Sequence, residues 1–86
     1  MKKAIRFTAN WCQPCRNYEK IWGSVSESRS DWEFVVIDVD LNPEKASEYT
    51  VRNIPCTILE DDDNVIFRQT GIISSDDLND KLNLYL

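Results

Sequence analysis

The sequence predicts an α/β domain with a mixed four-stranded sheet, three helices and helices on both faces of the sheet. Separate segments show the two-residue period of strands and the 3.6-residue period of helices. They follow the order β-α-β-α-β-β-α, in which a strand–helix–strand unit implies a parallel pair and a hairpin adds antiparallel strands. With 86 residues, 42% hydrophobic and 29% charged, the chain suits one domain over residues 1–86.

The first strand and the first helix are expected within residues 3–28. Residues 3–7 alternate, with Ile5 and Phe7 on one face and Arg6 on the other. Residues 11–14 form a turn into a helix, because proline is tolerated in the first helical turn. The helix ends near residue 28, and its apolar positions recur at helical spacing: Tyr18, Ile21, Trp22 and Val25.

The middle of the chain predicts a buried strand and a short helix. Residues 33–39 hold a continuous β-branched and aromatic run, which is typical of a strand buried on both faces. Asn42 and Pro43 suit the N-cap and first turn of a short helix that runs through Tyr49. Trp22 is expected in the core, and Trp32 is expected to be half-buried.

The last third of the chain predicts a hairpin and a final helix. Residues 57–59 and 65–67 form strands joined by the polar residues 60–64, whose three aspartates lie in a solvated turn. Residues 74–77, Ser-Ser-Asp-Asp, suit a helix N-terminus because they combine a capping serine with acids in the first turn. The inward positions of this helix are Leu78, Leu82 and Tyr85.

Charge and composition exclude several classes of function. Ten basic and fifteen acidic residues give a net charge of −5, so phosphates repel the domain and neither nucleic acid nor an anionic membrane is an expected partner. No apolar run approaches the ~18 residues of a membrane span, and no signal peptide is apparent, which predicts a cytoplasmic protein. The chain contains no histidine, so its chemistry must come from thiols or carboxylates.

Two of the three cysteines carry the chemical signal of the sequence. Cys12 and Cys15 stand three apart at the start of the first helix, within Trp-Cys-Gln-Pro-Cys. We expect the first sulfur at the exposed helix end, where the dipole and free N–H groups stabilise a thiolate, and the second one turn inside. This division suits disulfide exchange, in which Cys12 attacks a substrate disulfide and Cys15 resolves the mixed disulfide.

A metal site is the alternative of a different class. A Cys-x-x-Cys pair is half of many zinc sites, but such a site needs four ligands. Cys12, Cys15 and Cys56 are the only cysteines, so a metal or iron–sulfur module would depend on all three of them. A Cys-x-x-Cys pair between a strand and a helix favours redox chemistry.

The sequence resembles the thioredoxin family over nearly its whole length. Residues 11–15 are similar to the family's Trp-Cys-Gly-Pro-Cys active site, and Ile54-Pro55 is similar to its Ile-Pro with a cis peptide bond. Residues 40–55 match the family's run from the central strand to that proline without a gap, and Gly71 is similar to a loop glycine of the family. With eleven residues before Cys12, the chain resembles a compact, glutaredoxin-sized member.

The resemblance implies a thiol–disulfide oxidoreductase that reduces protein disulfides. It implies Cys12 as the nucleophile and Cys15 as the resolving thiol, with their redox-active disulfide in place of a cofactor and no metal. It implies re-reduction by thioredoxin reductase or another disulfide reductase, protein substrates such as ribonucleotide reductase, and a monomer. The substrate-binding residues that it implies are Trp11, Gln13, Pro14, Ile54, Pro55 and Gly71.

Departures from the family pattern concern the proton route. Gln13 replaces the glycine of the active-site loop, and Arg6 stands where the family has a buried aspartate. The lysine that usually neighbours this aspartate is replaced by Val36. Asp38 and Asp40, near the end of the central strand, are the candidate substitutes for the proton acceptor.

Cys56 and residues 74–77 leave two further alternatives. Cys56 follows the cis-proline candidate, where thioredoxins more often have threonine, and is either a small core residue or a third exchanging thiol. The acidic helix start at residues 74–77 is compatible with a glutaredoxin-like, glutathione-dependent protein. Trp11 and the long hairpin resemble thioredoxins instead.

Overall fold

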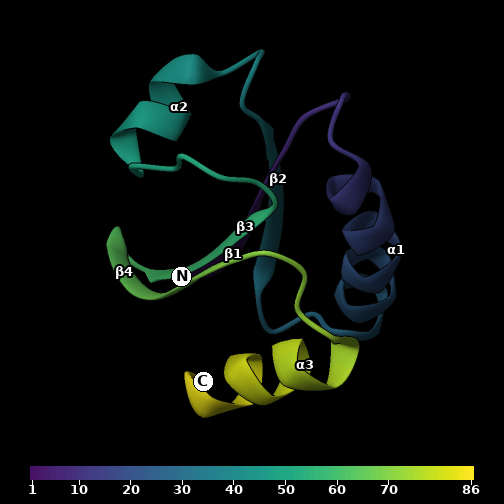
Figure 1. Ribbon diagram of the computed structural model, residues 1–86. Coiled ribbons are helices and arrows are strands. Elements are labelled where there is room, and N and C mark those ends of the chain that lie inside the picture. The colour runs from purple at the N-terminus through teal and green to yellow at the C-terminus, as the bar shows by residue number, and fades with distance from the viewer.

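A four-stranded sheet with helices on both faces forms the protein. The computed structural model describes residues 1–86 (Figure 1). The elements are β1 (Lys2–Thr8), α1 (Gln13–Ser28), β2 (Glu33–Asp38), α2 (Pro43–Glu48), β3 (Cys56–Asp61), β4 (Asn64–Thr70) and α3 (Ser75–Leu84). The predicted element order and fold class are confirmed.

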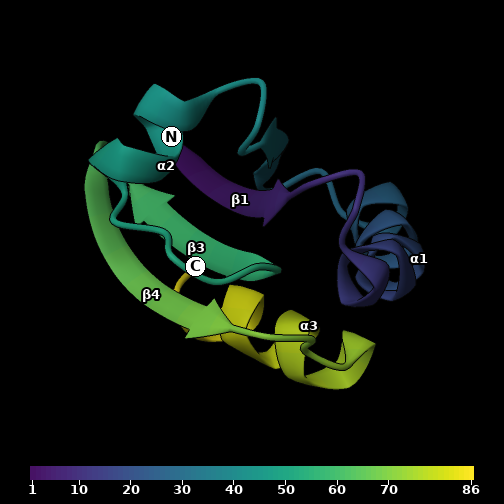
Figure 2. The same cartoon turned by 45° about the horizontal axis from the view of Figure 1, so that its top comes forward.

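The sheet has the strand order β2-β1-β3-β4. β1 pairs in parallel with β2, where Ile5 is opposite Val35, and antiparallel with β3, where Ile5 is opposite Ile58. β3 and β4 form the antiparallel hairpin, whose register shifts next to Leu59. Figure 2 shows the curvature of the sheet, with β1 central and β4 at one edge. The sheet is therefore mixed, as predicted.

Two apolar clusters lie on opposite faces of the sheet, because neighbouring residues of a strand point to opposite faces. Ala4 of β1 belongs to the cluster under α1 and α3, where Trp22 and Leu78 are buried. Ile5 and Phe7 belong to the other cluster, against which Tyr49, the C-cap residue of α2, and the segment that follows it pack. Each side of the sheet is therefore covered by helices.

Three local predictions are corrected. β2 is not buried on both faces, because it is an edge strand with β1 as its only neighbour, and Val36 is 50% exposed beside an open groove. Trp32 is not half-buried but 4% exposed, because it packs into the cluster under α1 and α3. Asn42 occupies the N-cap of α2, but its side chain donates to the Asp38 carbonyl at 3.2 Å and makes no cap bond.

The two longer helices, α1 and α3, begin where the sequence predicts their N-termini. Cys12 is the N-cap of α1 and Pro14 lies in its first turn. Ser74 caps α3, where its hydroxyl accepts the Asp77 N–H at 3.1 Å. None of the helices combines the length and the apolar character that a membrane crossing requires.

Candidate active site

A disulfide joins Cys12 and Cys15 where β1 gives way to α1. The sulfur atoms are 2.27 Å apart and the Cα atoms 5.2 Å apart. The turn before the bridge is closed by the Cys12 N–H, which donates to the Ala9 carbonyl at 3.2 Å. The loop that the sequence marks for thiol chemistry is therefore a hydrogen-bonded turn between β1 and α1.

The helix N-terminus acts directly on the first sulfur. The Cys15 N–H donates to the Cys12 Sγ at 3.2 Å, and the Arg16 N–H donates to the Cys12 carbonyl at 3.3 Å. No acidic side chain stands in the first turn of α1. When the bridge is reduced, the Cys15 N–H and the helix dipole stabilise negative charge on the Cys12 sulfur.

Both cysteines are buried, which corrects the prediction of an exposed first sulfur. Cys12 is 4% and Cys15 is 1% exposed. They pack with Ala9, and Val39 and Ile54 close over them. The Cys12 Sγ lies 3.9 Å from the Ile54 carbonyl oxygen, so the backbone before β3 shields the sulfur that a helix end alone would leave open.

The segment that shields the disulfide contains the cis peptide bond between Ile54 and Pro55. The N–H and C=O of Ile54 take part in none of the backbone–backbone hydrogen bonds of the fold, so they are free beside the sulfur. The carbonyl of the buried Pro55 accepts the Gly71 N–H at 2.8 Å. Gly71 has φ +98°, a left-handed conformation that glycine adopts without strain.

Exposed side chains border the disulfide on the helix side. Trp11 is 67% exposed, and its indole N–H donates to Asp40 at 2.8 Å. Gln13 and Pro14 are also exposed, and the Gln13 side-chain carbonyl accepts from Arg16 at 3.1 Å. The residues predicted to surround the disulfide thus come together at one end of the sheet.

The candidate proton acceptors have other partners. Asp38 accepts the backbone N–H groups of Asp40 and Leu41 at 2.9 and 3.2 Å. Asp40 in turn orients Trp11. Arg6, which stands in the place of the family's buried aspartate, is 5% exposed and its guanidinium lies 5.9 Å from the centre of the Trp22 ring. Burial lowers the pKa of Arg6.

Cys56 packs in the core, as the simpler of its two interpretations predicts. It is 1% exposed, unpaired, and clusters with Ile5, Phe7 and Ile58. Burial raises the pKa of its thiol, which disfavours the nucleophilic thiolate. No three cysteine or carboxylate side chains of the chain are grouped so that they could hold a metal ion. The proposed ligand set of Cys12, Cys15 and Cys56 is therefore not assembled.

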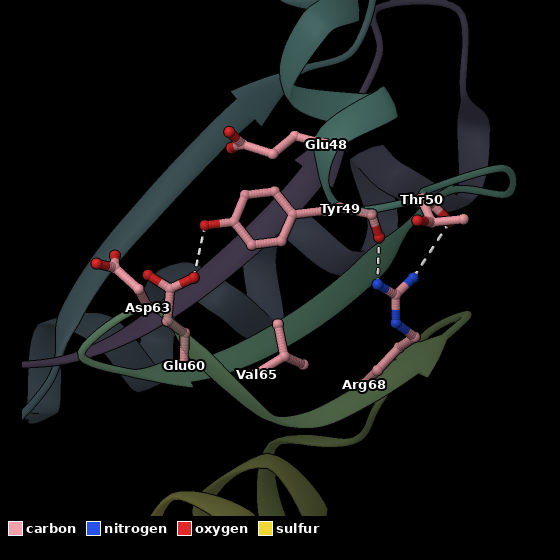
Figure 3. Close-up of a pocket in the computed structure, with 7 residues that line it drawn as sticks. All are labelled: Glu48, Tyr49, Thr50, Glu60, Asp63, Val65 and Arg68. Carbon is pink, nitrogen blue, oxygen red and sulfur yellow. Dashed lines mark hydrogen bonds between the residues drawn. The ribbon is translucent and has the colours of Figure 1, made fainter.

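A second polar site escaped the sequence analysis. It is a cavity of about 340 Å³ between the end of α2 and the hairpin (Figure 3). The Tyr49 hydroxyl donates to Glu60 at 2.5 Å, and Glu60 is 3% exposed. Burial and this bond raise the pKa of Tyr49 to about 12. Arg68 donates to the carbonyls of Tyr49 and Thr50, which fastens the end of α2 to β4. This site was not predicted because the sequence pattern places Glu60 in the polar turn, whereas Glu60 lies within β3 and is buried.

The fold and the site together define a thiol–disulfide oxidoreductase. A Cys-x-x-Cys disulfide begins a helix, its first sulfur accepts a helix N–H, and a cis-proline segment faces it. The sequence profile of the Thioredoxin family matches residues 2–84, and the chain belongs to that family.

Relatives and solved structures agree with this membership. The chain is 37% identical over 81 residues to a thioredoxin of Mycoplasmoides gallisepticum, an alignment that covers 94% of this chain and 81% of the relative. It is 34% identical to a thioredoxin of Buchnera aphidicola, with 99% and 81% covered. A mutant thioredoxin from Halobacterium salinarum superposes with a TM-score of 0.90 at 32% identity, over 98% of this chain and 74% of that one.

Family membership favours one of the three functions that the sequence left open. The protein is a thiol–disulfide oxidoreductase whose redox couple is the Cys12–Cys15 pair. The family implies reduction by a thioredoxin reductase and substrates that contain disulfides. The glutaredoxin-like and metal-binding alternatives have no comparable support.

Proposed function

We propose that Cys12 is the nucleophile and Cys15 the resolving thiol of a protein-disulfide reductase. The Cys12 thiolate attacks one sulfur of a substrate disulfide, forms a mixed disulfide and releases the other sulfur as a thiolate that takes up a proton. Cys15 then loses its proton and attacks the Cys12 sulfur, which leaves the Cys12–Cys15 bridge and a reduced substrate. The Cys15 N–H on the Cys12 sulfur is the observation that supports this order of attack.

The substrate binds along the exposed rim of the disulfide. We assign the backbone of Ile54, held by Pro55, to pair with an extended substrate segment, because its N–H and C=O have no backbone partner. Trp11 offers an apolar surface beside the disulfide. The remaining residues assigned to substrate contact are Gln13, Pro14 and Gly71.

The physiological setting follows from the same proposal. The chain acts as one domain over residues 1–86 and as a monomer in the cytoplasm, with no cofactor besides its disulfide. Thioredoxin reductase, or another disulfide reductase, returns it to the dithiol form, and ribonucleotide reductase is a candidate substrate.

Single cysteine variants test the order of the two steps. Each variant is reduced, mixed with a disulfide-containing protein such as insulin, and analysed by mass spectrometry without reductant. Cys15→Ser is expected to accumulate a mixed disulfide at Cys12, because the resolving thiol is missing. Cys12→Ser is expected to form none.

Cys56→Ser is the matched control, because Cys56 lies in the core and has no part in the proposed cycle. This variant should reduce insulin with an unchanged kcat/KM. A stable adduct on Cys15 in the Cys12→Ser variant, or loss of turnover in Cys56→Ser with the fold intact, would overturn the assignment.

A further inference from the structure

Arg6 is a buried cation without a partner. It is 5% exposed, and its Nε and Nη1 atoms are buried without a hydrogen-bond acceptor. It takes part in none of the ion pairs of the structure. The nearby Trp22 ring offers only its face, at 5.9 Å. Because buried charges are normally paired and hydrogen-bonded, the unpaired guanidinium of Arg6 points to a missing acceptor.

A groove of about 700 Å³ opens over this guanidinium. It lies at the carboxyl ends of the parallel strands β1 and β2, the edge of a parallel sheet where ligands bind most often. Arg6 and Val36, paired in the register, line it from the two strands. Thr8, the last residue of β1, and Asn10, just beyond this strand, line it as well. Thr8 and Asn10 supply further polar atoms, and neither side chain has a partner within the fold.

The other charged groups of the groove either have partners elsewhere or make no ion pair with Arg6. Arg16 donates to Gln13 and to the Asn10 carbonyl. Asp38 accepts two N–H groups of its own loop. Burial lowers the pKa of Arg6, and the charge of Glu19 opposes this lowering, but Glu19 makes no ion pair with Arg6. Arg6 is thus the one charged group of the groove that is both buried and unpartnered.

We propose that this groove binds an oxyanion, a carboxylate or a phosphate, through the guanidinium of Arg6. Such a group accepts a charge-assisted hydrogen bond from Nη2, the guanidinium nitrogen that is neither enclosed nor bonded within the fold, and offsets part of the cost of the unpaired charge. The net charge of −5 gives the protein no general attraction for anions, so affinity must arise locally. The groove also adjoins the disulfide, because Ala9 lines it and packs against both cysteines. The oxyanion is therefore either a free ion or an acidic side chain of a bound substrate.

Binding of small anions to the oxidised protein tests the proposal. Sodium phosphate and sodium acetate are titrated against sodium chloride at constant ionic strength, and two-dimensional NMR follows the Arg6 side-chain Nε–Hε and the amides of Thr8 and Asn10. We expect saturable shifts confined to the groove. Arg6→Met should weaken binding by roughly tenfold or more, since hydrogen bonds to a charged group are lost.

Arg52→Met is the matched control, because Arg52 is exposed and lies outside the groove. This substitution removes one positive charge, as Arg6→Met does. It should change the affinity less than about twofold, as an exposed charge contributes little. Arg6→Gln repeats the test, so that the result does not depend on one variant folding. The proposal fails if no shift saturates, if Arg6→Met and Arg6→Gln bind like the unchanged protein, or if Arg52→Met loses as much affinity.

Enzyme kinetics distinguish the two sources of the oxyanion. If the oxyanion is an acidic side chain of the substrate, phosphate should competitively inhibit the reduction of an acidic disulfide peptide, and Arg6→Met should abolish this inhibition. If it is a free ion, phosphate should bind without that effect. Both results keep the site, and they assign it to different ligands.

Discussion

Removing the Tyr18 hydroxyl should destabilise the protein by breaking a buried bond between the two halves of the active site. Tyr18 lies in α1, one turn beyond Cys15, and its hydroxyl lies 2.7 Å from the Thr57 hydroxyl of β3. Both residues are 0% exposed. Thr57 follows Pro55 by two residues, so this hydrogen bond ties the helix of the dithiol to the strand of the cis-proline.

The magnitude follows from the burial of both hydroxyl groups. In Tyr18→Phe the Thr57 hydroxyl stays buried without its partner, which costs about 1–3 kcal/mol of unfolding free energy. Thr57→Val leaves the Tyr18 hydroxyl in the same position and should cost a similar amount. In the double variant no unpaired buried hydroxyl remains, so its unfolding free energy should be close to that of the unchanged protein and well above what the sum of the two single losses would give.

Urea denaturation of the four oxidised proteins measures this cycle. A loss of about 1–3 kcal/mol also lowers the Tm of a domain of this size by several degrees per kcal/mol, which calorimetry can check. Additive losses, with the double variant as unstable as the sum of the single ones, would refute the reasoning. So would a Tyr18→Phe variant as stable as the parent.

Three further predictions concern other parts of the fold. Ultraviolet titration should show Tyr49 ionising near pH 12, and Glu60→Gln should lower this pKa. Because the pKa of Tyr49 is higher in the folded than in the unfolded protein, the neutral phenol contributes to the free energy of unfolding below pH ~10. This contribution is lost as the pH approaches about 12. Gly23→Ala should stabilise α1 by about 0.5–1 kcal/mol, because a Cβ at this helical position meets no atom within 4 Å. Gly71→Ala should destabilise the protein by about 1–3 kcal/mol, because its φ of +98° is strained for alanine. Urea denaturation that ranks the two variants in the opposite order would contradict this prediction. Cys56 should react with iodoacetamide far more slowly in the native protein than in urea, because it is buried and its pKa is raised; equal rates by mass spectrometry would show an accessible thiol.

Local patterns predicted the elements because each depends on neighbours in sequence. The helical spacing of Tyr18, Trp22 and Val25 marked α1, and these three side chains are buried on its inner face. The Cys-x-x-Cys pair and Ile54-Pro55 were recognisable as short motifs, and the structure brings them together. Motifs of this kind locate a site even where its detailed geometry is unknown.

Features that arise from the assembled sheet were not predictable in the same way. Arg6 alternates with apolar residues as on a half-exposed strand, but α1 lies over it and buries it. The apolar run of β2 looked like a central strand, although the sheet order places it at an edge. The Cys12 sulfur is shielded from solvent by Ile54, which is 42 residues away in sequence. Each error reflects a contact between distant segments, which a local pattern does not contain.

The short span of the disulfide sets how strongly the redox state and folding depend on each other. Its cysteines are separated by only 3 positions, so the bridge removes little freedom from the unfolded chain, roughly 2 kcal/mol by loop-closure entropy. In a thermodynamic cycle of folding and oxidation, the free energy by which the disulfide stabilises the fold equals the free energy by which folding favours the disulfide over the dithiol. Every turnover opens and closes that covalent link, whereas the sheet and its two larger apolar clusters are held by other residues. The protein can therefore act as a reservoir of two electrons that cycles while its architecture stays in place.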